Sequence, residues 1–125
     1  MKPETAQLLA NAQETLNAAE LLLNQGYLRD SASRAYYGFF YAAEALLNEK
    51  ELSFKKHGAV HSMFAQEFVK TGLFDARFHR GLLDAFNQRQ LGDYDEMVQF
   101  HREDIDETIQ QAREFLDAVK EFLNS

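Results

Sequence analysis

The chain has 125 residues, a formal net charge of −7 at pH 7 and no cysteine. This length suits one domain with a hydrophobic core, over residues 1–125, and is too short for two comfortable ones. The absence of cysteine excludes disulfides, thiolate metal sites and cysteine nucleophiles. The acidic balance argues against general coating of nucleic acid, which relies on a surplus of Lys and Arg, but it leaves room for a local cationic pocket.

No segment is typical of a membrane protein. The first residues, Met1 to Thr5, form no continuous apolar region, and no stretch approaches the roughly 18 apolar residues of a membrane span. The single proline, Pro3, lies near the start, and the glycines are scattered, so no interdomain linker is indicated. We therefore expect a soluble, cytoplasmic, single-domain protein without membrane contact.

Apolar side chains recur at steps of three and four residues along most of the chain, which predicts an all-α fold. Gly26, Gly72 and Gly92 are placed to end three of the helices. No alternating apolar pattern flanked by hairpin turns predicts a strand. The expected helices run from Glu4 to Asn24, from about Asp30 to Glu49, from about Gly58 to Lys70, from about Asp75 to Leu91 and from about Arg102 to Leu123.

These lengths predict an up-and-down bundle of four or five helices. The first, second and fifth helices are long enough to align as rods of roughly 30 Å, with the two shorter helices packed across them. The apolar stripe of the second helix is wider than one core-facing side requires, which predicts that this helix is central or shared with a partner chain.

The second helix contains the aromatic run Tyr36-Tyr37-Gly38-Phe39-Phe40-Tyr41. Such a run is either core and dimer packing or a platform on which bases stack. Tyr36 and Phe39 belong to the apolar stripe, which favours packing. Gly38 permits close approach of another backbone and favours a tight helix contact.

His57 and His61 are four residues apart, a spacing that can place two imidazoles on one helical face for a metal. No third ligand follows at a recognised interval, so we predict no metal site. His57 stands just before the third helix, where it can cap the helix or bind an anion with help from Lys55 and Lys56.

The segment Asn87 to Asp95 brings an arginine to the end of a helix, followed by a glycine, an acid and a tyrosine. Arg89 can clamp a phosphate with two donors, and Asp93 can orient the phosphate or a water. The alternative is a purely structural Arg89–Asp93 ion pair. Arg34, near Tyr37 and Tyr41 in helical space, can join Arg89 in one pocket if the second and fourth helices are neighbours.

Three stretches in this order resemble the HEPN domain family: Ser33 to Leu47, Lys56 to His61 and Arg89 to Tyr94. The resemblance covers nearly the whole chain. It implies an up-and-down helical bundle, usually a homodimer, that is often paired with a minimal nucleotidyltransferase as a two-component toxin and antitoxin. We predict no cofactor.

Many family members also share a ribonuclease motif, an arginine followed four to six residues later by a histidine. The matching arginine is Arg89, but Asp93 and Tyr94 occupy the place of the histidine, and His101 lies well outside it. The resemblance therefore makes Arg89, Asp93 and Tyr94 the candidate catalytic residues. In a degenerate ribonuclease, Asp93 or a histidine from elsewhere would replace the missing base. Tyr94 can instead accept a nucleotide from the partner enzyme.

The leading hypothesis is a module that binds a nucleotide or an RNA phosphate and acts with a minimal nucleotidyltransferase. Its binding residues would be Arg34, Tyr37, Tyr41, His57 and Arg89. A degenerate, metal-independent ribonuclease toxin is one alternative, and a purely structural dimeric bundle is the other.

Overall fold

The computed structural model describes residues 1–124 and confirms the all-α fold. Within that range every regular element is helical, and no helix combines the length and the apolarity that crossing a bilayer requires. The elements are α1 (Pro3–Asn24), α2 (Leu28–Glu49), α3 (His57–Phe64), the π-helical turn η1 (Ala65–Val69), α4 (Ala76–Tyr94) and α5 (Arg102–Asn124).

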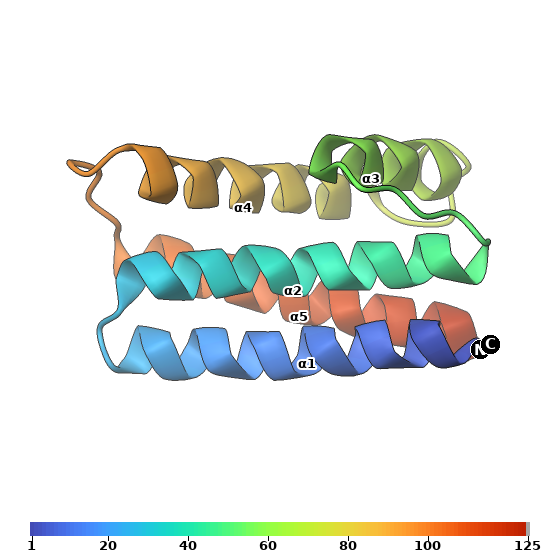
Figure 1. Ribbon diagram of the computed structural model, residues 1–125, viewed down its shortest axis with the longest axis horizontal. Helices are drawn as coiled ribbons and strands as arrows, with labels where there is room; N and C mark the ends of the chain where they lie inside the picture. Colours follow the sequence, from blue (N-terminus) through green and yellow to red (C-terminus); the bar gives the residue numbers. More distant parts are fainter. Residues whose placement is uncertain (125) are drawn as a thin grey trace.

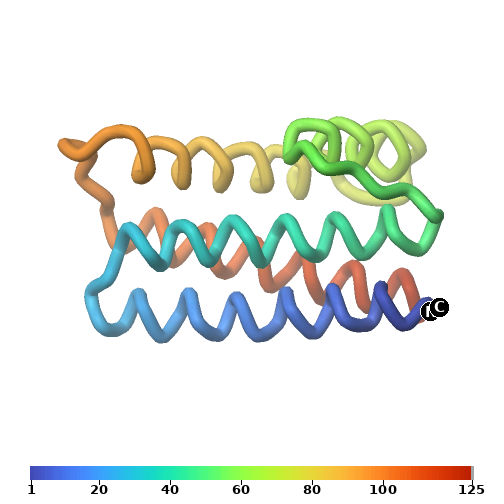
Figure 2. Tube along the Cα trace, in the orientation of Figure 1, coloured from blue at the N-terminus to red at the C-terminus, as the bar shows by residue number. Residues whose placement is uncertain are grey.

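Helix α2 lies at the centre of the bundle and packs against α1, α3, α4 and α5 (Figure 1). The expectation of a central second helix is therefore confirmed. The α1–α2 turn and the α4–α5 connection lie at one end of the molecule, whereas α1 begins and α5 finishes at the other (Figure 2). One expectation is wrong: α4 runs lengthwise above α2 rather than across the long helices, and α3 lies in the same layer (Figure 1).

The predicted helix ends are correct where the glycine adopts a left-handed backbone. Gly26 has a φ of 85° and Gly72 a φ of 81°, and both lie just beyond the helices that they end. Gly92 differs, because it lies inside α4, which continues to Tyr94. A Cβ at Gly92 would come within 2.7 Å of Phe100 Cζ, so the glycine permits close approach of the following loop rather than ending the helix.

The third helix is also less regular than its apolar pattern predicts. It is α-helical only to Phe64 and then widens into the π-helical turn, where Lys70 N donates to Ala65 O at 2.8 Å. The wider turn leaves Phe68 buried, and its ring stacks with that of Phe64, centroid to centroid at 6.2 Å. The irregular turn thus adds both aromatic rings to the core.

The central contact of the core is the close approach of α1 to α2. Gly38 is buried, and a Cβ at this position would overlap the side chain of Leu16, which is itself fully buried. The tight helix contact that Gly38 predicted is therefore made within the chain, with α1. This approach lets a fully buried Tyr36 and Phe39 occupy the other faces of α2.

We predict that Gly38→Ala destabilises the protein by about 1–3 kcal/mol, because the new Cβ would overlap Leu16, a fully buried side chain that would have to shift. This cost exceeds the gain of up to about 1 kcal/mol that alanine brings to a helix interior. Gly58→Ala is the matched control, since nothing lies within 4 Å of its Cβ position, and it should leave stability unchanged or raise it. Denaturant unfolding measures both, and equal stability of the two variants would contradict the packing argument.

Candidate functional site

Two histidines of α3 share the hydroxyl of one buried tyrosine of α2. The Tyr36 hydroxyl lies 2.9 Å from His57 Nδ1 and 2.8 Å from His61 Nε2. Because a phenol carries one proton, it donates one of these hydrogen bonds and accepts the other. The two histidines, one helical turn apart, are therefore held by a single polar group in the core.

Burial keeps this group uncharged. It raises the pKa of Tyr36 above its ordinary value, helped by the neighbouring Tyr37. It also lowers the pKa of His61 to about 4, with His57 and His79 adding to the effect. The pKa of His57 is lowered as well, first by burial and then by the positive charge of Arg89. At neutral pH both imidazoles are thus neutral and the phenol is protonated.

Two arginines from different helices converge on the ring of Tyr37. The guanidinium carbon of Arg34 on α2 lies 5.1 Å from the ring centroid, and that of Arg89 on α4 also lies 5.1 Å from it. Arg89 additionally lies 5.7 Å from the ring centroid of Tyr36. Since α2 and α4 are neighbours, the condition for a shared pocket is met.

The ion pair of Arg89 with Asp93 leaves part of the guanidinium without a partner. Arg89 Nε lies 3.3 Å from Asp93 Oδ2, one helical turn away on α4. Nevertheless, this nitrogen is buried and donates no hydrogen bond to any residue of the described part of the chain. The carboxylate balances the charge of Arg89 without bonding to the terminal guanidinium nitrogens, which are the donors that an anion could reach.

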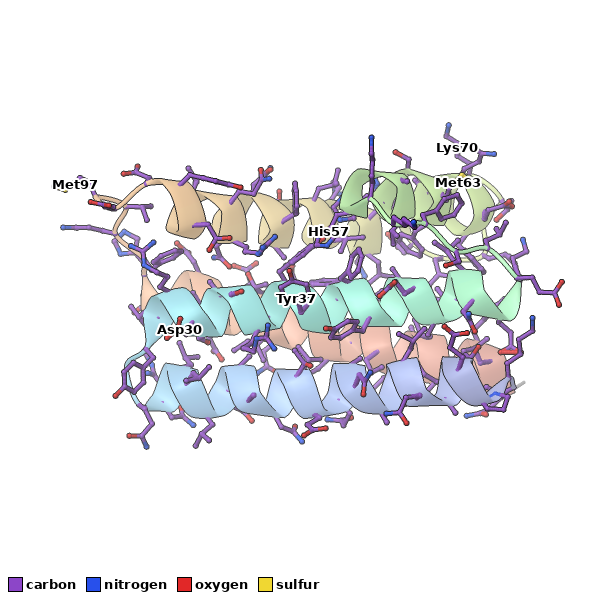
Figure 3. The ribbon with its side chains drawn as sticks, viewed as in Figure 1. Asp30, Tyr37, His57, Met63, Lys70 and Met97 are labelled. Atoms are coloured by element: carbon purple, nitrogen blue, oxygen red, sulfur yellow. The ribbon has the colours of Figure 1, made fainter. Side chains whose placement is uncertain are left out.

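The structure brings most of the predicted binding residues together. The ring centroid of Tyr37 lies 5.9 Å from that of His57 and 5.8 Å from that of Tyr41. Figure 3 shows Tyr37 and His57 next to each other between α2 and the layer formed by α3 and α4. We call the group of Arg34, Tyr37, His57 and Arg89 the Tyr37 cluster.

Tyr94 lies apart from the Tyr37 cluster. It is 84% exposed and lines a shallow groove with Asn87, Gln90, Leu91 and Asp95 on the outer side of α4. Asp93 is exposed, and its contact with the cluster is the ion pair with Arg89. The three candidate catalytic residues therefore do not converge within one chain.

Two interpretations of the sequence change with the structure. His57 does not cap α3: the N-cap is Lys56, no side chain bonds to the helix end, and the His57 ring turns instead to Tyr36. The apolar stripe favours packing for Tyr36, but this interpretation gives no partner to its hydroxyl. The missed signal is that a buried phenol needs a hydrogen-bond partner, and a His-x-x-x-His pair was available.

The family comparison agrees with this architecture. The family model described as "HEPN domain" matches residues 5–122. The chain belongs to the HEPN domain family. The match begins in the first turn of α1, ends in the last turn of α5 and includes every residue of the Tyr37 cluster.

Curated relatives extend the HEPN similarity over nearly the whole chain. A Methanocaldococcus jannaschii protein named "Putative toxin MJ0142" is 36% identical over 99% of this chain and 84% of its own length. "Putative toxin MJ0605" of the same organism is 35% identical over 98% of this chain and 91% of its own length. A Thermotoga maritima "UPF0332 protein" is 40% identical over 90% of this chain and 85% of its own length. The chain is thus a HEPN protein similar to proteins named as toxins.

The chemistry available to this HEPN domain is that of anion recognition on an aromatic surface. Two guanidiniums supply several fixed donors, an imidazole supplies another nitrogen, and Tyr37 offers a ring face on which a base can stack. No group of three metal-binding side chains occurs among residues 1–124. The cluster therefore fits a phosphate or phosphate-linked base better than a metal ion.

The buried histidines predict a pH dependence of stability. A histidine whose folded pKa is depressed binds fewer protons in the folded than in the unfolded state, so stability falls as pH drops below the unfolded pKa of about 6.5. With the pKa of His61 at about 4, the free energy of unfolding should fall by about 2 kcal/mol between about pH 7 and about pH 5.

Denaturant unfolding at several pH values measures this loss. His61→Gln should remove much of it, whereas His101→Gln, at an exposed histidine, should retain it. If wild type and His61→Gln lose stability in parallel, the buried imidazole is not the cause.

Proposed function

We propose that this HEPN protein is a toxin-type module that binds an RNA or nucleotide phosphate at the Tyr37 cluster in the cytoplasm. The observation that carries the proposal is the convergence of Arg34 and Arg89 on the ring of one partly buried tyrosine, Tyr37. A phosphate between the guanidiniums would reduce their mutual repulsion and accept hydrogen bonds from their terminal N–H groups. Stacking of a base on Tyr37 or Tyr41 would add affinity without strict sequence preference.

The partner in this proposal is a minimal nucleotidyltransferase, and the module itself pairs with a second copy of its own chain. Both follow from the HEPN resemblance, and the toxin names of the relatives are consistent with a two-component system. Tyr94 is the candidate acceptor of a nucleotide, since its hydroxyl is on an 84% exposed side chain that an enzyme can reach.

We predict that Arg34→Ala and Arg89→Ala each weaken binding of single-stranded RNA by about tenfold or more, because each removes charge-assisted hydrogen bonds to phosphate. Fluorescence anisotropy with a labelled RNA in the presence of EDTA measures the affinity. Arg77→Ala is the control: this arginine pairs with Glu114 at 2.8 Å, outside the cluster, and its loss should leave affinity unchanged.

Equal binding by wild type and both cluster variants would contradict the proposed site. The RNA recovered from the same assay also tests the ribonuclease alternative. For that reaction His57 is a better candidate base than Asp93, because its imidazole is neutral and near Arg89, whereas Asp93 is paired with that arginine. Shortened strands that appear with wild type and disappear with Arg89→Ala would indicate cleavage.

We predict that incubation with the nucleotidyltransferase partner and ATP adds a nucleotide mass to the protein, and that Tyr94→Phe abolishes the adduct. Intact-mass spectrometry measures it. Tyr27→Phe is the matched control, because Tyr27 is also exposed, at 59%, but lies in the α1–α2 turn. An adduct that persists in Tyr94→Phe would place the modification elsewhere, and none on wild type would remove this part of the proposal.

A further inference from the structure

The nitrogen of His57 that does not face Tyr36 is free to meet a ligand. Nδ1 contacts the Tyr36 hydroxyl, and no residue of the described part of the chain bonds to Nε2. In the described part of the chain, the buried side-chain nitrogen without a hydrogen-bond partner is Arg89 Nε. His57 Nε2 also has no partner but is not buried, so it is open to solvent. His57 therefore offers the Tyr37 cluster a nitrogen that can gain a proton.

The hydrogen-bond chain behind His57 has one order that suits a protonated imidazole. His57 Nδ1–H then donates to the Tyr36 oxygen, and the Tyr36 O–H donates to His61 Nε2. This order requires His61 to stay neutral, which its pKa of about 4 ensures. Both hydrogen bonds, from His57 to Tyr36 and from Tyr36 to His61, are then formed. A proton on His57 Nε2 therefore leaves no buried group without a partner.

The charges around His57 explain why the proton is absent before a ligand binds. The titratable and charged groups that face it are Tyr36 and Tyr37 on α2, His61 on α3 and Arg89 on α4, with Arg34 across Tyr37. Among the described residues no carboxylate raises the pKa of His57: Glu44 acts on Tyr36 behind it, and Asp93 pairs with Arg89. A doubly charged anion would supply the missing counter-charge.

We propose that the Tyr37 cluster selects a phosphate monoester, the terminal phosphate of an RNA strand or a nucleoside monophosphate, and that His57 takes up a proton when this ligand binds. The inference rests on the proposed phosphate-binding function and names its ligand class. An internal phosphodiester carries one negative charge, which two guanidiniums already balance. A monoester carries close to two negative charges at neutral pH. It also has a third terminal oxygen, which can accept a hydrogen bond from His57 Nε2–H.

The sign of the pH dependence follows from this arrangement. The free protein has a depressed His57 pKa, and the bound dianion raises it, so binding takes up a proton between the two values. Affinity for the monoester should therefore increase as pH falls from about 8 towards about 7, where the phosphate, with a second pKa of about 6, is still mostly doubly charged. His61 remains neutral throughout this window and contributes nothing to the change.

Calorimetric titration with four probes tests the ligand class. The probes are adenosine 5′-monophosphate and one single-stranded RNA carrying a 5′-phosphate, a 3′-phosphate or only hydroxyl ends. A terminal phosphate should tighten binding by about tenfold or more over the hydroxyl-ended strand. Tighter binding of the phosphorylated RNA than of the mononucleotide identifies a strand end as the ligand, and similar affinities identify a free nucleotide; both support monoester selection.

Titration in two buffers of different protonation enthalpy measures the proton. At about pH 7, wild type should take up on the order of half a proton or more per ligand. His57→Gln retains the ligand's own titration but should lose this uptake and most of the preference for a terminal phosphate. Tyr36→Phe, which removes the acceptor of Nδ1–H, should reduce the uptake, and His101→Gln should leave it unchanged.

The outcomes separate this inference from the proposed function. If all RNAs bind equally and Arg89→Ala weakens them equally, the phosphate site stands and monoester selection is wrong. If the terminal phosphate is preferred but His57→Gln takes up as many protons as wild type, the role of His57 is wrong. If no probe binds, the proposed function itself fails.

Discussion

The hydroxyl of Tyr36 is the polar contact on which the upper half of the bundle depends. It lies where α2, α3 and α4 meet, since its ring also packs 5.3 Å from Phe86 of α4, between centroids. A buried phenol without a partner costs about 1–3 kcal/mol, so the two histidine bonds are needed for the fold as well as for any activity. They attach the short α3, which has few helical turns of its own, to the central helix.

That same contact sets the protonation of the surface above it. Tyr36 engages one nitrogen of His57 and leaves the other unbonded, with Arg89 of α4 near enough to lower the pKa of the imidazole. The direction of the Tyr36 hydrogen bonds in the core therefore determines whether the solvent-facing nitrogen of His57 carries a proton that it can donate. Structure and site are not separable here, because the group that holds α3 in place also determines what His57 can offer a ligand.

The acidic net charge and the cationic cluster are compatible because their length scales differ. Charges at the surface are screened over about 8–10 Å in ordinary salt, whereas Arg34 and Arg89 lie within 5.1 Å of the same ring. The ring faces partly compensate the like charges, since a guanidinium over an aromatic face gains about 0.5–2 kcal/mol. A chain of net charge −7 can thus present a local anion site while the rest of its surface repels nucleic acid.

Sequence periodicity was sufficient for the five helices and for the central place of α2, because an apolar stripe is a local property that tertiary packing seldom overrides. Periodicity was insufficient for Gly92. The glycine is needed there because a Cβ would clash with Phe100 of the following loop, not because the backbone is left-handed. The meeting of Arg34 with Arg89 was conditional on helix neighbours that no local pattern specifies. The Tyr36–His57–His61 group was not predicted for the same reason, since the two histidines lie 21 and 25 residues from Tyr36 along the sequence.

The position of Tyr94 constrains how its modification could regulate the Tyr37 cluster. Arg89 and Tyr94 are five residues apart on α4, which on a regular helix places them about 140° apart around the axis. Arg89 faces α2, whereas Tyr94 faces the groove of Asn87, Gln90 and Leu91. A nucleotide on Tyr94 would therefore first meet that outer groove and not the guanidinium of its own chain. If the modification blocks the phosphate site, the shorter route is through a second copy whose cluster lies against this groove, which makes dimerisation a condition of the regulation.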